Sequence, residues 1–325
     1  MHVPDGFLDA KTALAAGILS AAGLALALGR VRRRFPPRRI PLIGLAAAFV
    51  FAAQMLNFPV AGGTSGHLIG GVLAAVLLGA SAAVLVMSSV VILQCFMFAD
   101  GGLTALGANL FDMALVAPVV GYGVYRLVRR VAPDTLRGRL LAAGFAAWCS
   151  TVAAAVACAG QLALSGTVAW RVALPAMAGV HMLIGLGEAL ITALVVAAVA
   201  HARPDLLHEP DSLEGWRRSA DIVGYGLLVA VGLVLFVAPF ASPWPDGLQR
   251  VAASLGFSPK AAPVLGPPLA RYLVPGLGSG PASTAIAGGV GTVVAFGVAY
   301  LAARALTPAR RRPAEPAPRN GAERA

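Results

Sequence analysis

Long apolar runs, separated by arginine clusters and by turns rich in glycine and proline, dominate the chain. Nine runs approach the ~20 residues that a helix needs to cross a bilayer. They are residues 11–29, 40–57, 67–80, 83–99, 104–128, 139–163, 172–200, 221–240 and 285–306. Of the 325 residues, 58% are hydrophobic and only 12% are charged, whereas a soluble domain has about a quarter charged. The sequence therefore predicts an all-α, polytopic transmembrane bundle.

Residues 67–99 allow two interpretations, two short helices or one long helix. Gly79 and Ser81 favour a tight connection between two short helices. A single span here would reverse every later helix and place the arginines of residues 126–139 outside the cell.

The arginines form three clusters, in residues 30–39, 126–139 and 304–312, and give the chain a net charge of +11. Such a charge would suit nucleic acid, but these clusters lie between apolar runs or after the last one, as in cytoplasmic loops. Nine spans that start outside put all three on the cytoplasmic side of the cell membrane, with the carboxyl terminus. Arginines follow the first apolar run rather than precede it, which is the reverse of a cleavable signal. Met1 and His2 are therefore expected to remain in the mature protein. For the chain as a whole we expect membrane lipid, and no nucleic acid, as a partner.

The chain begins Met1-His2, which is a potential chelator. The Met1 α-amine, the His2 backbone nitrogen (if that amide ionises) and His2 Nδ1 can close two fused rings on one ion. Nitrogens in one plane suit nickel, copper or low-spin cobalt. Pro4 keeps Val3 out of the helical region, and Gly6 allows the segment to turn back. An ordinary mobile terminus can begin with the same two residues.

A second histidine, His67, follows a loop that contains Pro59, Gly62, Gly63 and Gly66. We expect this loop to deliver His67 to the outer end of a helix, where its imidazole is a candidate fourth nitrogen ligand. A histidine at that position could instead serve as a hydrogen-bonding group within the bundle.

Other polar side chains lie within or beside the apolar runs, where they usually face an interior or a cavity. The candidates for hydrogen bonds to the ligand imidazoles are Asn57, Thr64, Ser65, Asp100, Asn109 and His181. Gln161 and Asp112 are expected to join helices. His181 and Glu188 are two turns apart on one helix face, which fits either a proton path or plain packing.

The sequence lacks the motifs of several classes of enzyme. The chain has no G-x-x-x-x-G-K-[ST] phosphate loop and only two lysines, Lys11 and Lys260, so it holds no ATP site of that kind. It has no H-E-x-x-H and no G-x-S-x-G motif. Ser65 and His67 are two residues apart and would not face each other on a helix. We therefore expect no enzymatic activity.

Several motifs resemble the substrate-binding membrane subunit of energy-coupling-factor cobalt/nickel transporters (the CbiM/NikM type). They are residues 1–8 (MHVPDGFL), 54–60 (QMLNFPV), 62–68 (GGTSGHL), 100–109 (DGGLTALGAN) and 181–191. The resemblance covers roughly residues 1–203 and implies a seven-helix subunit whose amino terminus inserts into its own bundle. Met1, His2 and His67 would then hold Co²⁺ or Ni²⁺ as the transported substrate. It also implies a separate transmembrane coupling subunit and cytoplasmic ATPase subunits as partners.

Residues 221–306 resemble the two-span companion subunit of the same systems. Pro245 to Gln249 (PDGLQ) is similar to its PDGLE signature, with Gln249 in place of the usual glutamate, so a role that needs a carboxylate there is in doubt. Apolar residues after Asp246 have helical spacing and predict a short amphipathic helix on the outer surface. The expected organisation is a metal-binding domain (1–203), a cytoplasmic linker (204–220), a companion domain (221–306) and a disordered tail (307–325).

The leading hypothesis is thus a membrane module that captures Co²⁺ or Ni²⁺ and catalyses nothing. The alternative is a self-sufficient secondary metal transporter driven by protons through His181 and Glu188. Secondary carriers often show inverted repeats, and we find no such pattern in this sequence.

Overall fold

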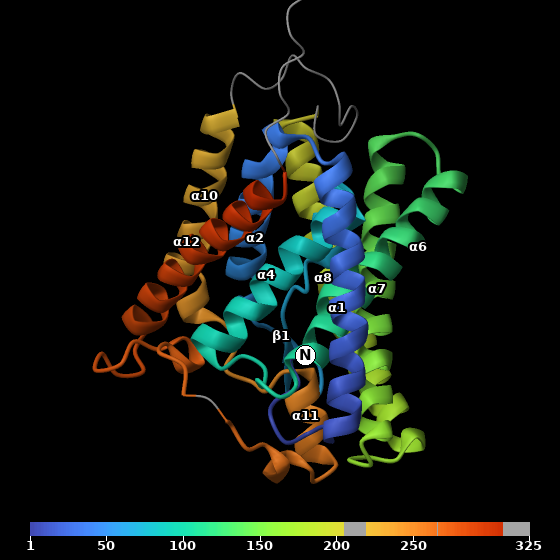
Figure 1. Cartoon of the computed structure of the whole chain (residues 1–325), viewed down its shortest axis with the longest axis vertical. Coiled ribbons are helices and arrows are strands. Elements are labelled where there is room, and N and C mark those ends of the chain that lie inside the picture. Colours follow the sequence, from blue (N-terminus) through green and yellow to red (C-terminus); the bar gives the residue numbers. More distant parts are fainter. Residues whose placement is uncertain (205–218, 265, 308–325) are drawn as a thin grey trace, which may run out of the picture.

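The computed structural model describes residues 1–204, 219–264 and 266–307, and helices occupy every predicted apolar stretch (Figure 1). The helices are α1 (Ala10–Arg34), α2 (Ile40–Gln54), α3 (Gly71–Leu78), α4 (Ala80–Phe98), α5 (Leu106–Asn109), α6 (Ala117–Val131), α7 (Leu136–Leu164), α8 (Trp170–Ala202), α10 (Ser219–Phe236), α11 (Gly247–Ser254) and α12 (Pro281–Leu306). A π-helical segment, Leu110–Val116, joins α5 to α6. Most of the predicted linker and tail lies outside the described residues.

A small antiparallel sheet interrupts the helical bundle between α2 and α3. It pairs β1 (Phe58–Val60) with β2 (Thr64–Gly66), with Pro59 opposite Ser65. Gly62 and Gly63, at φ 84° and 70°, make the turn of this hairpin, because both residues adopt the left-handed conformation that glycine tolerates. His67 follows β2 directly.

Two of the nine predicted spans are shorter than expected. In the described part of the chain, seven helical segments are long and apolar enough to cross a membrane. Helices α2 and α3 have 15 and 8 residues, or roughly 22 and 12 Å at 1.5 Å per residue, and α3 falls well short of a ~30 Å bilayer core. The β1–β2 hairpin and the loop after it take up residues that the sequence pattern had assigned to both helices.

The predicted division of residues 67–99 is confirmed. Gly79, at φ 87°, ends α3 and precedes α4, so the chain bends where only glycine is free of strain. At the other end of α3, both Glu188 oxygens accept hydrogen bonds, from Ile69 N (2.5 Å) and Gly70 N (2.9 Å). Glu188 on α8 therefore fixes the loop that carries His67.

The first two arginine clusters, in residues 30–39 and 126–139, lie at one end of the molecule, the upper end in Figure 1. There α1 passes into α2, α6 passes into α7, and α12 ends. The amino terminus lies among the helices in the other half of the bundle. This one-sided distribution is the pattern that the positive-inside argument predicts for alternating spans.

The last two long helices, α10 and α12, pack beside α2 (Figure 1). Gly291, Ala295, Ala299 and Ala303 form a smooth, buried stripe on α12. A Cβ atom at Gly291 would lie 2.2 Å from the Phe51 ring on α2. Small residues on this stripe thus allow close helix–helix packing inside the chain.

Candidate metal centre

The first eight residues fold back into the protein instead of extending α1, which begins at Ala10 after the cap residue Asp9. Met1 is 4% exposed and Val3 is fully buried. Val3 N donates to Asn109 Oδ1 (2.7 Å), and Asn109 Nδ2 donates to Val3 O (3.0 Å). The Asn109 amide therefore binds the backbone of Val3 as a neighbouring strand would.

Asp5 anchors the same segment from its other end. Asp5 Oδ1 accepts hydrogen bonds from Thr104 N and Thr104 Oγ1, both 2.7 Å, and Asp5 Oδ2 accepts one from Val264 N (3.1 Å). Burial raises the pKa of Asp5, but these hydrogen bonds outweigh burial and bring its pKa below the ordinary value. The amino-terminal segment is thus held between the α4–α5 loop and the chain between α10 and α12 (residues 237–264 and 266–280), which we call the C-terminal segment.

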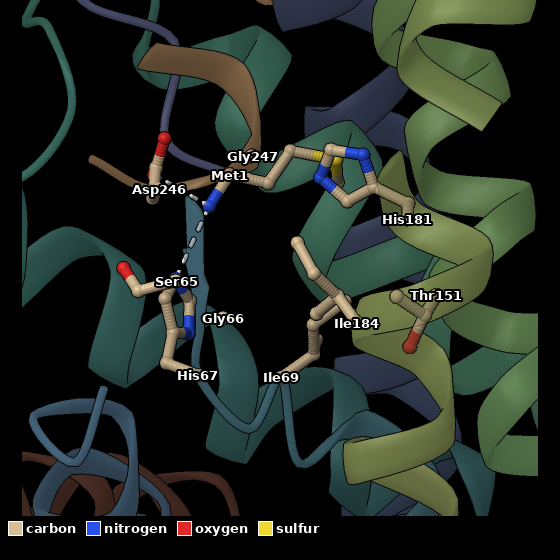
Figure 2. Close-up of a pocket in the computed structure, with 10 residues that line it drawn as sticks. All are labelled: Met1, Ser65, Gly66, His67, Ile69, Thr151, His181, Ile184, Asp246 and Gly247. Atoms are coloured by element: carbon tan, nitrogen blue, oxygen red, sulfur yellow. Dashed lines mark hydrogen bonds and ion pairs between the residues drawn. The ribbon is translucent and has the colours of Figure 1, made fainter. Parts of the chain in front are cut away.

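The Met1 amine meets His67 and Asp246. Its nitrogen lies 3.1 Å from His67 Nε2 and 3.1 Å from Asp246 Oδ2 (Figure 2). His67 Nδ1 lies 3.0 Å from the carbonyl of Leu68, so Nδ1 donates and Nε2 is left with its lone pair toward the amine. Burial and the nearby Met1 ammonium lower the pKa of His67 to about 3, which keeps its ring neutral.

The His2 imidazole stacks beside that of His67, with ring centroids 5.7 Å apart. Its Nδ1 lies 3.0 Å from Asp100 Oδ1, and its Nε2 lies 3.1 Å from Gln94 Oε1. Burial raises the pKa of Asp100, but the electrostatic interaction with His2 and the hydrogen bonds from His2 and Tyr272 outweigh burial, so the pKa of Asp100 is lowered. Asp100 therefore stays ionised beside His2.

Three of the predicted supporting residues hold the C-terminal segment. Thr64 Oγ1 donates to Pro245 O (3.0 Å), and Ser65 Oγ donates to Trp244 O (2.7 Å). The carbonyl of Asn57 accepts from Ser242 N (2.8 Å). These bonds, together with a parallel bridge between Ser65 and Asp246, place Asp246 beside Met1.

His181 lies on the wall of a small cavity that Met1, His67 and Asp246 also line. Figure 2 shows His181 and His67 on opposite sides of it. His181 Nδ1 lies 2.7 Å from the carbonyl of Met177, and its buried Nε2 has no hydrogen-bond partner among the described residues. A Cβ at Gly247 would lie 2.8 Å from that Nε2, so glycine is needed there.

Asp246, Gln94 and Tyr272 were not among the predicted site residues. Asp246 caps α11: its Oδ1 accepts from Gln249 N (2.8 Å), and Gln249 Oε1 accepts from Asp246 N (3.4 Å). Gln249 therefore completes a capping box as a glutamate would. The capping sequence can be read from the chain, but nothing local in it indicates that Asp246 also pairs with Met1.

The short amphipathic helix predicted from the apolar residues after Asp246 is confirmed as α11. Its apolar residues Leu248, Val251 and Ala252 are buried against the protein, and α11 packs next to α8 and β2. The helix therefore covers the amino-terminal site and presents its apolar face to the bundle.

The donors gathered here are mainly nitrogens. Within residues 1–204, 219–264 and 266–307, no three histidine, cysteine, aspartate or glutamate side chains cluster as a metal site on their own. The terminal amine and the imidazoles of His2 and His67 are the candidate donors. Nitrogen donors suit late first-row divalent ions, not magnesium or calcium.

Fold and site together define a multi-pass α-helical membrane protein with a buried, nitrogen-rich site at its own amino terminus. Residues 2–206 match the family described as "Cobalt uptake substrate-specific transmembrane region" (CbiM). This match spans more than half of the chain, and the chain belongs to that family. It is a cobalt/nickel uptake transport component of the CbiM/NikM family and not an enzyme.

Relatives extend the similarity beyond the family region. The chain is 40% identical over 290 residues to a putative fused nickel transport protein NikMN of Archaeoglobus fulgidus, covering 89% of this chain and 93% of the relative. It is 30% identical over 274 residues to a probable fused nickel transport protein LarMN of Lactiplantibacillus plantarum, covering 80% of this chain and 83% of the relative. A crystal structure of a truncated transition metal transporter matches 62% of this chain and 99% of its own, with 34% identity and a TM-score of 0.57.

Proposed function

We propose that this chain captures Ni²⁺ or Co²⁺ as the substrate-specific membrane component of an energy-coupling-factor uptake transporter. The observation that carries the proposal is the buried Met1 amine, 3.1 Å from His67 Nε2 with the His2 ring stacked alongside. Relatives named as nickel transport proteins match both the amino-terminal and the C-terminal parts of the chain, which supports nickel or a similar ion as the substrate.

In the proposed complex, the ion binds the Met1 amine, the His2 backbone nitrogen, His2 Nδ1 and His67 Nε2. His2 Nδ1 faces Asp100 in the structure, so the ring must turn before Nδ1 can reach the ion. A half-turn about the Cβ–Cγ bond moves Nδ1 to the opposite side and brings Nε2 between Asp100 and Gln94. The remaining N–H of the ring then still has an acceptor, as metal-bound imidazoles usually do.

The Met1 ammonium, which contacts Asp246 and His67 in the structure, must lose a proton before its nitrogen can bind the ion. Ligand nitrogens must lose protons before they bind a metal, so capture is coupled to proton release. Four nitrogen ligands around one ion favour planar coordination, and this geometry selects against ions that prefer oxygen ligands in other arrangements.

Transport then requires a transmembrane coupling subunit and cytoplasmic ATPase subunits, because the chain carries no phosphate loop of its own. The arginine-rich end of the bundle is the cytoplasmic end under the positive-inside rule, which leaves the amino-terminal site toward the outside. Residues 1–203 form the metal-binding domain in this proposal, and residues 221–306 form the companion domain that covers it.

The alternative, a proton-driven secondary carrier, has less support. Both oxygens of Glu188 accept backbone hydrogen bonds from Ile69 and Gly70, and His181 Nδ1 is bonded to Met177 O. Glu188 thus has a structural role that explains its burial without proton transfer.

Uptake in sealed vesicles distinguishes the two. We expect ⁶³Ni accumulation only when the coupling and ATPase subunits are co-expressed and ATP is present. Accumulation by this chain alone, driven by a proton gradient and abolished by Glu188→Gln, would favour the secondary carrier. Competitive calorimetry of the purified chain with Ni²⁺ and Co²⁺ then identifies the preferred ion.

A further inference from the structure

Tyr272 belongs to the C-terminal segment, but its hydroxyl reaches the supports of the His2 imidazole. It donates to Asp100 Oδ2 at 2.6 Å and accepts a longer bond from Gln94 Nε2 at 3.4 Å. Asp100 and Gln94 are the two side chains that face the ring nitrogens of His2. One hydroxyl therefore contacts both groups that orient this imidazole.

The backbone around Tyr272 is arranged for this contact. Arg271 and Tyr272 both have φ 58°, a left-handed conformation that is uncommon for residues with side chains and persists only where the surroundings impose it. Leu269 N donates to Met97 O (2.9 Å) and ties the turn to the end of α4. The strained turn thus directs the tyrosine ring inward.

Inside the protein, the ring packs in an aromatic group. Tyr272 stacks on Phe98 with centroids 4.6 Å apart and lies 6.1 Å from Phe51. Burial and the negative charge of Asp100 raise the pKa of Tyr272 well above its ordinary value. The hydroxyl therefore keeps its proton and remains a donor to the Asp100 carboxylate.

A carboxylate that accepts a hydrogen bond from a metal-binding imidazole fixes the orientation of the ring and strengthens it as a ligand. Asp100 can do so only if its own orientation is fixed, and Tyr272 supplies the bond to its second oxygen. The packing of Tyr272 on Phe98 holds the donor in place. The hydroxyl of the C-terminal segment is thus linked to His2 through one carboxylate.

We propose that Tyr272 is a positioning residue for metal capture: by holding Asp100, it sets the His2 imidazole and makes the C-terminal segment a structural part of the metal site. This inference rests on the proposed function, because it assumes that His2 binds the ion.

Tyr272→Phe in the full-length chain tests the proposal, because phenylalanine keeps the aromatic packing and removes only the hydroxyl. We expect Ni²⁺ affinity by calorimetry to fall by up to roughly 10-fold, because the 10–100-fold loss seen when a partner of a ligand is removed would apply to Asp100, and Tyr272 acts through Asp100. Tyr300→Phe is the matched control, since that hydroxyl bonds to Arg304 (2.9 Å) at an exposed position on α12. Its affinity should equal that of the unmodified chain.

Two further readouts separate positioning from general stability. The visible ligand-field absorption of the nickel-bound protein should change in Tyr272→Phe and stay unchanged in Tyr300→Phe. In a double-mutant cycle, Tyr272→Phe should add little to the loss caused by Asp100→Asn, because both changes break the same link. Wild-type affinity in Tyr272→Phe, or a loss that adds fully to that of Asp100→Asn, would overturn the proposal.

His2→Ala distinguishes this inference from the proposed function. If Ni²⁺ binding by the unmodified chain does not depend on His2, the proposed metal site itself is wrong. If binding depends on His2 but not on the Tyr272 hydroxyl, only the positioning role is wrong.

Discussion

The Met1 nitrogen and Asp246 Oδ2 form an ion pair 3.1 Å long, and both side chains are largely shielded from solvent (2% and 14% exposed). The pair joins the first residue of the chain to the cap of α11. Removing one partner of a buried ion pair leaves an uncompensated charge. The amino terminus and the C-terminal segment therefore stabilise each other's positions.

Extending the amino terminus by one glycine should abolish tight Ni²⁺ binding. The extension moves the free amine away from His67 and Asp246, and the former amine becomes an amide that cannot act as the same ligand. We expect a loss of at least ~100-fold in affinity by calorimetry, since a ligand and its chelate ring are lost. The control is a glycine added after Ala325, which should bind as before. An unchanged affinity in the extended chain would contradict the site.

His67→Ala should weaken Ni²⁺ binding by at least ~10-fold, because it removes one nitrogen ligand. The matched control is His201→Ala, since His201 is exposed near the end of α8, where its Nδ1 lies 2.8 Å from Ala197 O of the same helix. Titrations of the two variants under identical conditions give the comparison. Equal affinities would show that His67 does not hold the ion.

Asp246→Asn should loosen the amino-terminal segment in the metal-free protein. Asparagine caps a helix about as well as aspartate, so α11 should remain while the charge opposite Met1 is lost. We expect hydrogen exchange at the Val3 amide to accelerate roughly tenfold, or about 1.4 kcal/mol. Asp134→Asn, which affects a surface ion pair whose aspartate is 75% exposed, should leave this amide unchanged. Equal protection of Val3 in the Asp246→Asn variant would argue against the ion pair as an anchor.

Metal release and opening of the amino-terminal segment should occur at different pH. The pKa values of Asp5 and Asp246 are lowered, so their stabilisation is fully present above the unfolded value of ~3.9 and is lost as the pH falls through the lower folded values. Protons also compete with the metal for its nitrogen ligands, and this competition acts at a higher pH than the protonation of Asp5 and Asp246. As the pH is lowered from about 7 while staying above ~3.9, Ni²⁺ affinity should therefore drop and Val3 should stay protected from exchange. Loss of both over the same pH range would contradict this account.

The helical bundle could be predicted because long apolar runs have few alternatives in a membrane. The bend at Gly79 and the start of α11 were also readable, since glycine and the Asp246-to-Gln249 capping pattern are local signals. The lengths of α2 and α3 could not be predicted from the sequence. The loop that carries His67 is itself apolar at both ends, so its composition does not show where the helices stop.

Contacts between distant parts of the chain were the harder part of the site. Met1, His2 and His67 were identified from ligand chemistry and a resemblance, and the structure brings them together. The pairing of Asp246 with Met1 and the inward turn of Tyr272 depend on tertiary packing. Two successive non-glycine residues at positive φ have no local sequence signal. Glu188, expected on a proton path or in packing, caps the loop before α3.

The most direct test is a structure of the full-length chain loaded with nickel, with the ion located by anomalous scattering at its absorption edge. The account predicts one strong peak bounded by the Met1 amine, His2 and His67, with the amino terminus still folded into the bundle. A peak elsewhere in the protein, with Met1 and His2 free in solvent, would contradict it.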